Sequence, residues 1–348
     1  MGCAPRAQRH RAHRGHTRRH LARLPGRPCR RRDEPRLARR VPGPALMASG
    51  AAGVPDRDAR CPVCGAPASR LRYSITRFRI YDCAQCTLVY LWPQIDDDEV
   101  RALFARLYTE GEGSVPELAT YYDFTYSDSP GNPLVAIYER WLDAIERERP
   151  PGRLLDIGCG TGLFLAVARR RGWQPYGVDD CGEATAHARS HFGLEVWDGQ
   201  FMDFAAQREL RFDAIAMWDI IEHSRDPVAL LSAARGALAP GGVIGISTPN
   251  QNSILDVVAG LLYRGSGGWI TRPLEKFYIE QHFLYFSPDT LCDALARAGL
   301  SAVRLDRELT ELRRLSLSPA KRIVLEALFA AARQTRLENR LFAIARTR

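Results

Sequence analysis

The sequence predicts an α/β fold, a seven-stranded mixed sheet with helices on both faces, which follows a small cysteine-rich module and an Arg-rich tail. Three observations lead to this prediction. An apolar segment at residues 153–157 runs directly into a glycine-rich turn at residues 158–162, and a helical period begins at Leu163. Apolar segments and helical periods then alternate along the chain, which is typical of a mostly parallel sheet covered by helices. Two Cys-x-x-Cys pairs precede this alternation and predict the small module.

The glycine-rich turn is the first candidate binding element. Its three glycines allow the main chain to bend and to approach a ligand without a Cβ in the way. The N-terminus of the following helix offers free amides to a carboxylate or a phosphate, so this loop alone does not identify the ligand. A second predicted strand, residues 174–178, ends in Asp179-Asp180, about 20 residues after the glycines, where an acid usually hydrogen-bonds a ribose. This spacing predicts a ligand that contains adenosine.

Five more strands complete the predicted sheet, at residues 194–197, 212–217, 243–247, 301–309 and 341–347. Asp203 follows the first of these strands, and Trp218 and the pair Glu222-His223 follow the second. Ligands of open α/β sheets bind outside the carboxyl ends of the strands, so we expect these side chains near one crevice.

Four motifs give the chain a resemblance to a known family: LLDIGCGTG, GVD, FDAIAMWDIIEH and LAPGGVIGISTPN. In this order and spacing they resemble the class I S-adenosylmethionine-dependent methyltransferases, which have a Rossmann-like fold, and the resemblance covers residues 153–300. It implies S-adenosylmethionine as the cofactor, with Asp156 facing its amino group, Asp179 the ribose and Asp203 the adenine amine. The positions that the resemblance implies for cofactor binding are Asp156, Gly158, Cys159, Gly160, Asp179, Asp203 and Trp218.

Positive charge is concentrated at the N-terminus. Residues 1–46 hold fourteen Arg against two acids, a charge of +12 within a total of +9, so the rest of the chain carries −3. A basic balance confined to a tail does not argue that the core binds nucleic acid. Residues 1–52 lack any periodicity that packs a core, so we expect a disordered tail; a basic arm for RNA or a membrane surface, and an upstream extension that ends before Met47, stay open. No apolar run reaches the roughly 18 residues that span a bilayer, and we expect a soluble, cytoplasmic protein.

Four cysteines within residues 53–95 have the spacing of a zinc ribbon. Two Cys-x-x-Cys pairs, separated by 18 residues, each supply two sulfurs on one tight turn, and tetrahedral Zn²⁺ joins both pairs. Four thiolates leave no open coordination position, so the zinc is expected to be structural. Two disulfides or a redox pair are the alternatives, which a cytosolic location and the missing βαβ context disfavour. The predicted ligands are Cys61, Cys64, Cys83 and Cys86.

Two segments are candidates for the acceptor side. Residues 96–132 begin with a predicted helix and continue in a loop crowded with Tyr and Phe, which either closes over a substrate or forms the apolar underside of a linker. In the predicted methyltransferase domain, residues 133–348, the stretch 251–287 combines an apolar helix with a glycine hinge and Trp269, and is predicted to be a lid. We expect this domain to bind the cofactor without the segments before it. The order of modules resembles that of zinc-bearing bacterial small-molecule methyltransferases, among them the sugar C-methyltransferases.

Two histidines are candidates for a general base. Methyl transfer from a sulfonium is an in-line displacement, so the enzyme supplies positioning and, for a poor nucleophile, a base. His223 follows the strand at 212–217 and His282 lies near the end of the lid, and the resemblance to the sugar C-methyltransferases implies both positions. Gln281 stands before His282 and Glu280 one place earlier, which departs from the Glu-His pair of that group. The alternative is structural, with His223 next to a helix cap and His282 packed in its loop.

The sequence therefore predicts transfer of a methyl group from S-adenosylmethionine to a small-molecule acceptor, either a sugar nucleotide or a secondary metabolite. The alternative acceptor is a lipid-like quinone precursor, reached through peripheral contact with a membrane. An RNA methyltransferase is disfavoured, because residues 218–221 lack the Asn/Asp-Pro-Pro-aromatic motif of base-amine enzymes. A non-catalytic binding module is disfavoured, because the acids and glycines of the cofactor motifs are present. Neither the methylated atom nor the oligomeric state follows from the sequence.

Overall fold

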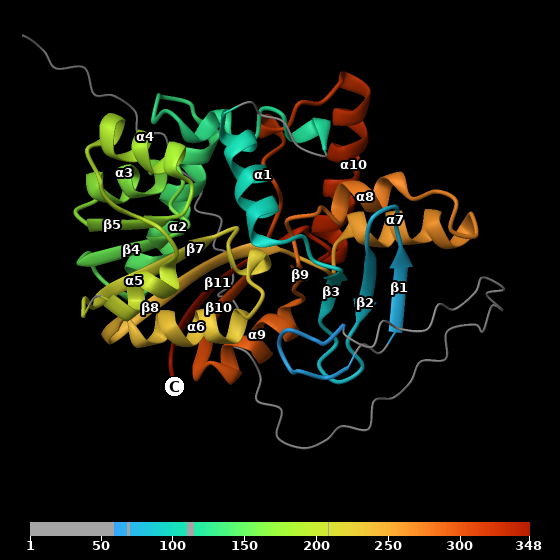
Figure 1. Ribbon diagram of the computed structural model, residues 1–348. Coiled ribbons are helices and arrows are strands. Elements are labelled where there is room, and N and C mark those ends of the chain that lie inside the picture. Colours follow the sequence, from blue (N-terminus) through green and yellow to red (C-terminus); the bar gives the residue numbers. More distant parts are fainter. Residues whose placement is uncertain (1–58, 68–69, 110–114, 208) are drawn as a thin grey trace, which may run out of the picture.

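A computed structural model describes residues 59–67, 70–109, 115–207 and 209–348 (Figure 1). The predicted tail, residues 1–52, lies outside them. A seven-stranded sheet forms the centre, in the order β10-β11-β8-β7-β4-β5-β6. Its strands are β4 (Arg153–Ile157), β5 (Gln174–Asp179), β6 (Glu195–Asp198), β7 (Phe212–Trp218), β8 (Leu238–Pro249), β10 (Leu300–Glu308) and β11 (Arg340–Thr347). Strand β11 is antiparallel to the other six strands, which share one direction. The predicted seven-stranded mixed sheet is therefore confirmed.

Helices cover both faces of this sheet. Along β4, Leu154 belongs to one apolar core and Leu155 and Ile157 to the other, because successive side chains of a strand point to opposite faces. The first core contains α2 (Pro133–Glu148), α3 (Leu163–Arg170) and α4 (Gly182–Phe192), and the second contains α5 (Phe201–Gln207), α6 (Pro227–Gly236) and α9 (Pro288–Arg297). Packing on both sides fixes the carboxyl end of β4, where the glycine turn begins.

Side-chain caps explain where several helices begin. A polar side chain just before the helix accepts a main-chain N–H of the first turn and so satisfies a donor that has no partner inside the helix. Proline follows this cap in α2, α6, α9 and α10 (Pro319–Thr335), where its missing N–H costs nothing. The caps are Asn132, Asp226, Ser253, Ser287 and Ser318.

The strand predicted at residues 243–247 begins earlier than expected and includes the glycines before it. β8 runs from Leu238 to Pro249, and its pairing with β7 jumps from Phe212–Leu238 to Ala214–Val243. The extra residues of β8 form an irregularity in the ladder, and Gly241 adopts a left-handed φ of 73° there. The prediction of a strand that starts after the glycines was therefore too short.

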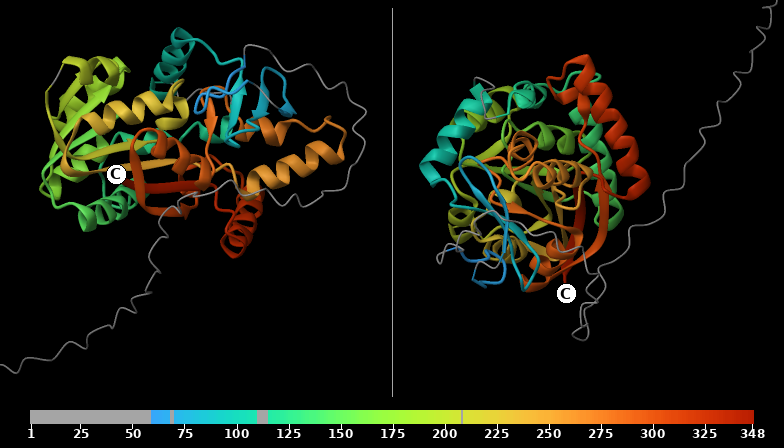
Figure 2. Two further views of the ribbon diagram at one scale, coloured as in Figure 1. Left: turned by 90° about the horizontal axis from the view of Figure 1, so that it is seen from below. Right: turned by 90° about the vertical axis from the view of Figure 1, so that its right-hand side faces the viewer.

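The cysteine-rich module shares a sheet with the end of the predicted lid. Its strands β1 (Arg70–Ser74), β2 (Arg79–Asp82) and β3 (Val89–Trp92) are joined by β9 (Leu284–Tyr285), which pairs antiparallel with β3. In Figure 2 the blue strands of the module lie beside the orange lid helices α7 (Ile254–Gly265) and α8 (Arg272–Phe277). One apolar core continues from the module into the main sheet, so the predicted boundary after residue 95 is not an edge of the packing.

The remaining elements lie around the carboxyl ends of the strands. They are α1 (Asp97–Thr109) and the short 3-10 helices η1 (Pro116–Leu118), η2 (Asp123–Thr125), η3 (Ile221–His223) and η4 (Leu312–Arg314). In the part of the chain that the structure describes, no helix combines the length and the apolar character needed to cross a bilayer.

Candidate functional site

A cavity of about 1140 Å³ opens at the carboxyl ends of β4, β5 and β7. The glycine turn forms its floor, the segment from α1 to α2 forms one wall, and the lid helices, η4 and α10 form the other. The exposed surface of its lining is largely apolar, and charged side chains of both signs lie among the apolar and aromatic ones. Predominantly apolar linings with placed polar groups are usual in small-molecule sites.

The glycine turn and Asp179 form one hydrogen-bonded unit. Asp179 Oδ2 accepts the amide of Gly160 at 2.7 Å, and Oδ1 accepts the amide of Cys181 at 2.9 Å. Burial raises the pKa of Asp179 to about 6, although these two amides oppose the rise. Gly160 has a φ of 50° and a side chain there would clash with the Tyr108 hydroxyl, so the turn requires glycine. Asp179 also lines the cavity, and its role in holding a ribose stays a prediction.

Asp156, at the end of β4, is a buried acid without a complete set of partners. It is 1% exposed, it lines the cavity, and its Oδ1 has no hydrogen-bond partner among the described residues. Burial and then the charge of Asp179 raise its pKa well above the usual range. A ligand cation at this position would relieve both effects. The amino group of S-adenosylmethionine is such a cation, so the cavity fits the predicted cofactor.

The other predicted cofactor residues differ in their placement. Cys159 lines the cavity beside Gly158, and its amide donates to Val178 O at 3.1 Å. Trp218 also lines it, stacked on Trp141 with ring centroids 4.4 Å apart. Asp203 does not line the cavity.

Helix α5 explains the position of Asp203. The helix starts at Phe201, which points into the core, and Asp203 is exposed two positions later. Gln200, Phe201 and Met202 line the cavity instead. The family resemblance implied that Asp203 faces the adenine amine, but the helix that starts at Phe201 turns its side chain away from the cavity.

The aromatic segment before α2 covers the glycine turn. Thr161 Oγ1 donates to Thr125 O at 2.5 Å, and Tyr108 packs against Gly160. Tyr122 packs edge-on against Tyr108, with ring centroids 4.9 Å apart. The segment thus lines the cavity together with the glycine turn. That a domain beginning at residue 133 binds the cofactor by itself stays a prediction. The crowding of Tyr and Phe was the signal for this wall.

Both predicted histidines line the cavity and face each other. The rings of His223 and His282 lie 4.9 Å apart. His223 Nδ1 lies 2.6 Å from Gln281 O and donates its hydrogen, which leaves Nε2 with a lone pair. Burial lowers the pKa of His223. Burial, then the charges of His223 and Arg340, lower the pKa of His282 well below its usual range, so His282 is a neutral acceptor at neutral pH.

Glu222, not Glu280, is the carboxyl group of this cluster. Glu280 binds Arg77 of the cysteine-rich module at 2.9 Å. Glu222 is fully buried in η3, accepts a hydrogen bond from Thr248 Oγ1 at 2.9 Å, and offers an oxygen within 4.8 Å of both histidine ligand atoms. Burial and then the charge of Asp219 raise its pKa to about 8. This grouping suits proton transfer, and its three ligand atoms also have a spacing that a divalent cation accepts.

The sequence analysis did not predict two clusters of charged side chains at the cavity. Asp219 follows β7 with a left-handed φ of 57° and pairs with Arg340, which comes from β11 more than a hundred residues later. Arg340 also donates to Ser247 Oγ at 2.7 Å. Elsewhere in the lining of the cavity, the Glu117 carboxylate forms ion pairs with Lys276 of α8 and with Lys321 of α10, the latter at 2.8 Å. We call this three-residue contact the lysine clasp.

The four predicted zinc ligands form a compact sulfur cluster. Their Sγ atoms all lie within 4.8 Å of one another, and all four cysteines are free of disulfides. The two turns have the same geometry: Cys61 N donates to Ala66 O at 2.8 Å, and Cys83 N donates to Leu88 O at 2.9 Å. The residue after each second cysteine is left-handed, Gly65 at 71° and Thr87 at 64°. Four sulfurs on two matched turns are the donor set of a closed zinc site.

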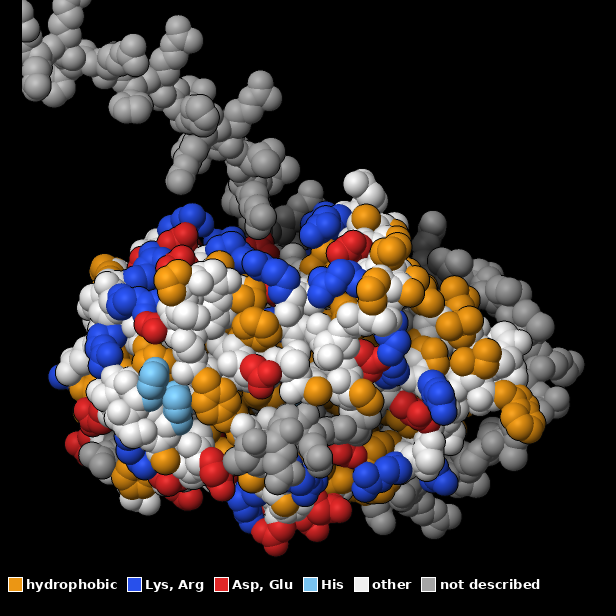
Figure 3. All heavy atoms as spheres, turned by 90° about the horizontal axis from the view of Figure 1, so that it is seen from above, with side chains coloured by type: hydrophobic (Ala, Val, Ile, Leu, Met, Phe, Trp, Pro, Cys, Tyr) orange, Lys and Arg blue, Asp and Glu red, His pale blue; other side chains and the backbone are white. Residues whose placement is uncertain are grey.

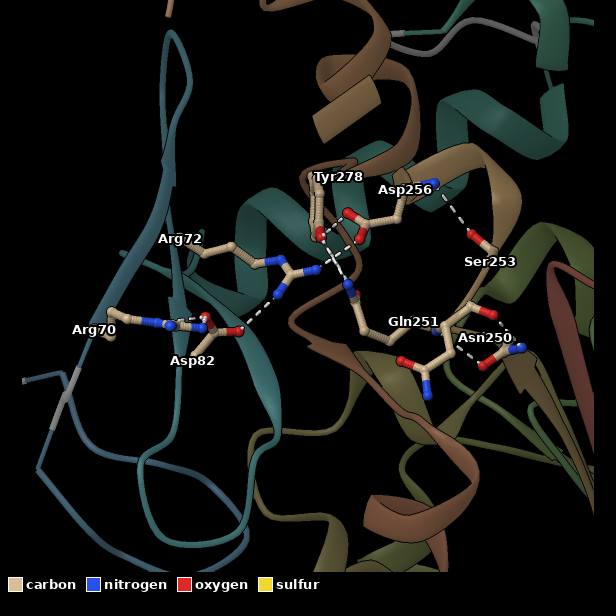
Figure 4. A network of polar contacts seen from close by, with 9 residues as sticks. Arg70, Arg72, Asp82, Asn250, Gln251, Ser253, Asp256 and Tyr278 are labelled. Atoms are coloured by element: carbon tan, nitrogen blue, oxygen red, sulfur yellow. Dashed lines mark hydrogen bonds and ion pairs between the residues drawn. The ribbon is translucent and has the colours of Figure 1, made fainter. Parts of the chain in front are cut away.

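A polar network ties this module to the lid (Figure 4). Arg72 of β1 bridges Asp82 Oδ1 at 3.1 Å and Asp256 Oδ2 at 2.6 Å, and Asp256 lies in the first turn of α7. The Tyr278 hydroxyl donates a hydrogen bond to Asp256 Oδ1 at 2.7 Å. The same hydroxyl oxygen accepts a hydrogen bond from Gln251 Nε2 at 3.1 Å. The network therefore fixes both ends of the lid helices against the module.

The sheet, the glycine turn and the buried acids above it define a cofactor-binding protein of the Rossmann-like class. Residues 135–305 match the family described as "Methyltransferase domain". A ubiquinone biosynthesis O-methyltransferase from Cereibacter sphaeroides is 35% identical over 158 residues, which are 43% of this chain and 61% of the relative. One of the same name from Xylella fastidiosa is 32% identical over 179 residues, 49% of this chain and 70% of the relative. The chain belongs to the class I S-adenosylmethionine-dependent methyltransferases.

Two facts define the extent of these similarities. The chain spans about three fifths of the length of the Cereibacter relative. Among solved structures, magnesium protoporphyrin IX methyltransferase from Synechocystis PCC 6803 covers 73% of this chain and 100% of its own, at 14% identity and a TM-score of 0.47. The family assignment rests on the sequence similarities.

Proposed function

We propose that the protein transfers the methyl group of S-adenosylmethionine to a hydroxyl oxygen of a lipid-like phenol, a quinone precursor, at a membrane surface. The names of the relatives support this acceptor rather than the sugar nucleotide or secondary metabolite expected first. The largely apolar and aromatic lining of the cavity supports it as well.

The observation that carries the proposal is an apolar surface at the cavity mouth. Seven exposed residues on α7, the loop after it and α10 form what we call the apolar rim: Val257, Leu261, Leu262, Trp269, Ile270, Ile323 and Val324. Trp269 is 90% exposed, and α7 and α10 contact each other. Val258 and Leu325, their neighbours in sequence, line the cavity. Figure 3 shows hydrophobic side chains gathered on the right side of the molecule, with Lys and Arg beside them. An apolar surface with basic neighbours suits an interface with anionic lipids.

The chain's own residues supply positioning and a base. S-adenosylmethionine supplies an electrophilic methyl group on its sulfonium. Asp156 would hold the amino group and Asp179 the ribose hydroxyls, and Gln200 and Met202 would take the adenine position predicted for Asp203. His282 or His223 accepts the hydroxyl proton as the oxygen attacks, since both rings face the cavity and are neutral at neutral pH.

We also propose that Cys61, Cys64, Cys83 and Cys86 hold one structural Zn²⁺. The matched turns and the sulfur cluster support this, and a closed four-thiolate site leaves no position for a substrate. The metal would keep β1, β2 and β3 in place as the support of the lid.

Asp156→Asn should weaken S-adenosylmethionine binding roughly 10- to 150-fold, the range of a lost charge-assisted hydrogen bond of about 1.5–3 kcal/mol. Asp179→Ala should have an effect of the same size, because its ribose contacts are lost. Titration calorimetry measures both. Asp203→Ala is the matched control and should bind the cofactor as the parent does, since its side chain is exposed outside the cavity. Equal affinity of the Asp156 variant and the parent would refute this cofactor placement.

Trp269→Ser with Ile270→Ser should lower partition into vesicles of phosphatidylglycerol and phosphatidylcholine about 10²- to 10⁴-fold, since two fully buried apolar side chains at about 1.5–3 kcal/mol each contribute about 3–6 kcal/mol together. Vesicle sedimentation measures the partition. Met202→Ser is the control, because Met202 is 47% exposed but lies on α5, outside the apolar rim. Unchanged partition of the rim variant, or no partition of the parent, would contradict the membrane contact.

A further inference from the structure

Arg314 is a buried cation that lines the cavity and, within the described part of the chain, has no acidic partner. It ends η4 and is 8% exposed. Among the described residues no carboxylate lies within 4.0 Å of it, and its Nε has no hydrogen-bond partner. Its guanidinium lies over the ring of Tyr121, 3.6 Å from the centroid, and Nη2 donates to Tyr121 O at 3.3 Å. One weak hydrogen bond and a ring contact leave most of its donors unused.

The other cations on the cavity wall differ from Arg314 in this respect. Each of those in the described residues is within reach of a carboxylate: Arg101, Arg140, Arg225, Lys276, Lys321 and Arg340. The neighbouring acid, Glu311, binds Arg313 at 2.9 Å and is not available. A buried charge without a counterion is costly, so the position suits a site whose negative charge arrives with a ligand.

The surroundings of Arg314 place it on the acceptor side. Tyr122, Asp219 and Arg314 all line the cavity, and burial raises the pKa of Tyr122, with the charges of Asp219 and Arg314 acting on it in opposite directions. Asp219 pairs with Arg340, whose charge reaches His282. Beyond Arg314, the apolar residues Leu315, Leu317 and Leu328 continue the lining towards α10 and the apolar rim. Tyr121, which lies under the Arg314 guanidinium, packs edge-on against Tyr122 with ring centroids 5.6 Å apart, so Arg314 adjoins an aromatic part of the cavity wall.

We propose that Arg314 binds an anionic oxygen substituent of the acceptor, in the simplest case a ring carboxylate, so that the enzyme's acceptor is an acidic phenol. This inference rests on the proposed function, which supplies the phenol. The guanidinium fork offers a carboxylate two parallel hydrogen bonds and fixes the orientation of the ring, while the tail follows the apolar lining outwards. A neutral phenol would leave the buried charge unpaired.

The test compares two probes, 3,4-dihydroxybenzoate and its neutral counterpart 3,4-dihydroxybenzamide. Quenching of tryptophan fluorescence measures their affinity, because Trp141 and Trp218 line the cavity. The parent should bind the acid at least about 10-fold more tightly than the amide. Arg314→Met should remove this preference while keeping affinity for the amide and for S-adenosylmethionine, and Arg314→Lys should restore part of it. Arg313→Met is the matched control and should keep the full preference, because Arg313 is 59% exposed and pairs with Glu311.

Three results would overturn the inference: equal affinity of the parent for both probes, no binding of the acid, or equal loss of both probes in Arg314→Met. A methylation assay with the same probes separates this failure from that of the proposed function. If the amide is methylated as well as the acid, phenol methylation stands and the anion site fails. If neither is methylated while the acid binds in an Arg314-dependent way, the anion site stands and phenol methylation fails.

Discussion

His282→Ala should lower kcat by about 10²–10⁴ and leave the affinity for S-adenosylmethionine nearly unchanged, because a general base acts in the transition state and does not hold the cofactor. The ring faces His223 across 4.9 Å and, among the described residues, its nitrogens make no hydrogen bond. Turnover of a phenol that the parent methylates gives kcat, and calorimetry gives the cofactor affinity. His191→Ala is the control, because His191 is exposed on α4.

The pH dependence gives a second readout for His282. Burial, His223 and Arg340 lower its pKa, so the unprotonated base is fully present at neutral pH and is lost only as the pH falls through the lowered value. The inflection of the pH–rate profile should thus lie below the ordinary histidine pKa of about 6.5. Near-parental turnover of His282→Ala would return both histidines to a structural role and leave the reaction to positioning alone.

Cys83→Ser with Cys86→Ser should abolish binding of one Zn²⁺ per chain and reduce kcat/KM for the acceptor at least about 10-fold. Structural Zn²⁺ contributes about 10–16 kcal/mol in zinc-finger peptides. This exceeds most of the 5–15 kcal/mol that stabilises a typical domain. Without the metal the module should therefore lose its fold, and with it the β3–β9 pairing directly after His282. Affinity for S-adenosylmethionine should change less than threefold, since Asp156 and Asp179 lie on β4 and β5.

A milder variant separates the metal from the contact with the lid. Arg72→Met should keep the zinc but still reduce kcat/KM for the acceptor, because it removes the bridge to Asp256. Arg70→Met is the control, since Arg70 is 75% exposed and pairs only with Asp82 in the network of Figure 4. Metal analysis that finds no zinc in the parent, or metal-free protein with parental acceptor kinetics, would contradict the supporting role of the module.

Local pattern was sufficient to predict the sheet and the cofactor edge. The apolar run of β4 and the glycines after it leave few alternatives, because the main chain at Gly160 cannot accept a Cβ beside Tyr108. Asp179 follows from its place at the end of a strand, and Asp156 is a cofactor residue that the family resemblance implies. Asp203 shows the limit of this reasoning. It lies close in sequence to residues that line the cavity, but it is on helix α5, which starts at Phe201, and the helical turn points its side chain to solvent.

Contacts between distant segments were beyond local pattern. Arg340 reaches Asp219 from β11, Glu222 replaces Glu280 beside the histidines, and β9 adds a strand to the cysteine-rich module. Each of these three contacts joins segments that are far apart in the sequence, and the periodicity and motif spacing of one segment cannot predict which other segment it meets. Arg314 is the clearest case, because an arginine is an ordinary surface residue in so Arg-rich a chain until packing buries it.

The lysine clasp at Glu117 has a consequence for chemical labelling. Lys276 and Lys321 are the only lysines in the sequence, so every side-chain amine of the protein lies in this one contact. Acylation removes the positive charge of a lysine. A reagent specific for such amines would therefore neutralise both partners of Glu117, modify no other lysine, and report by its rate how firmly α8 and α10 are held together over the cavity.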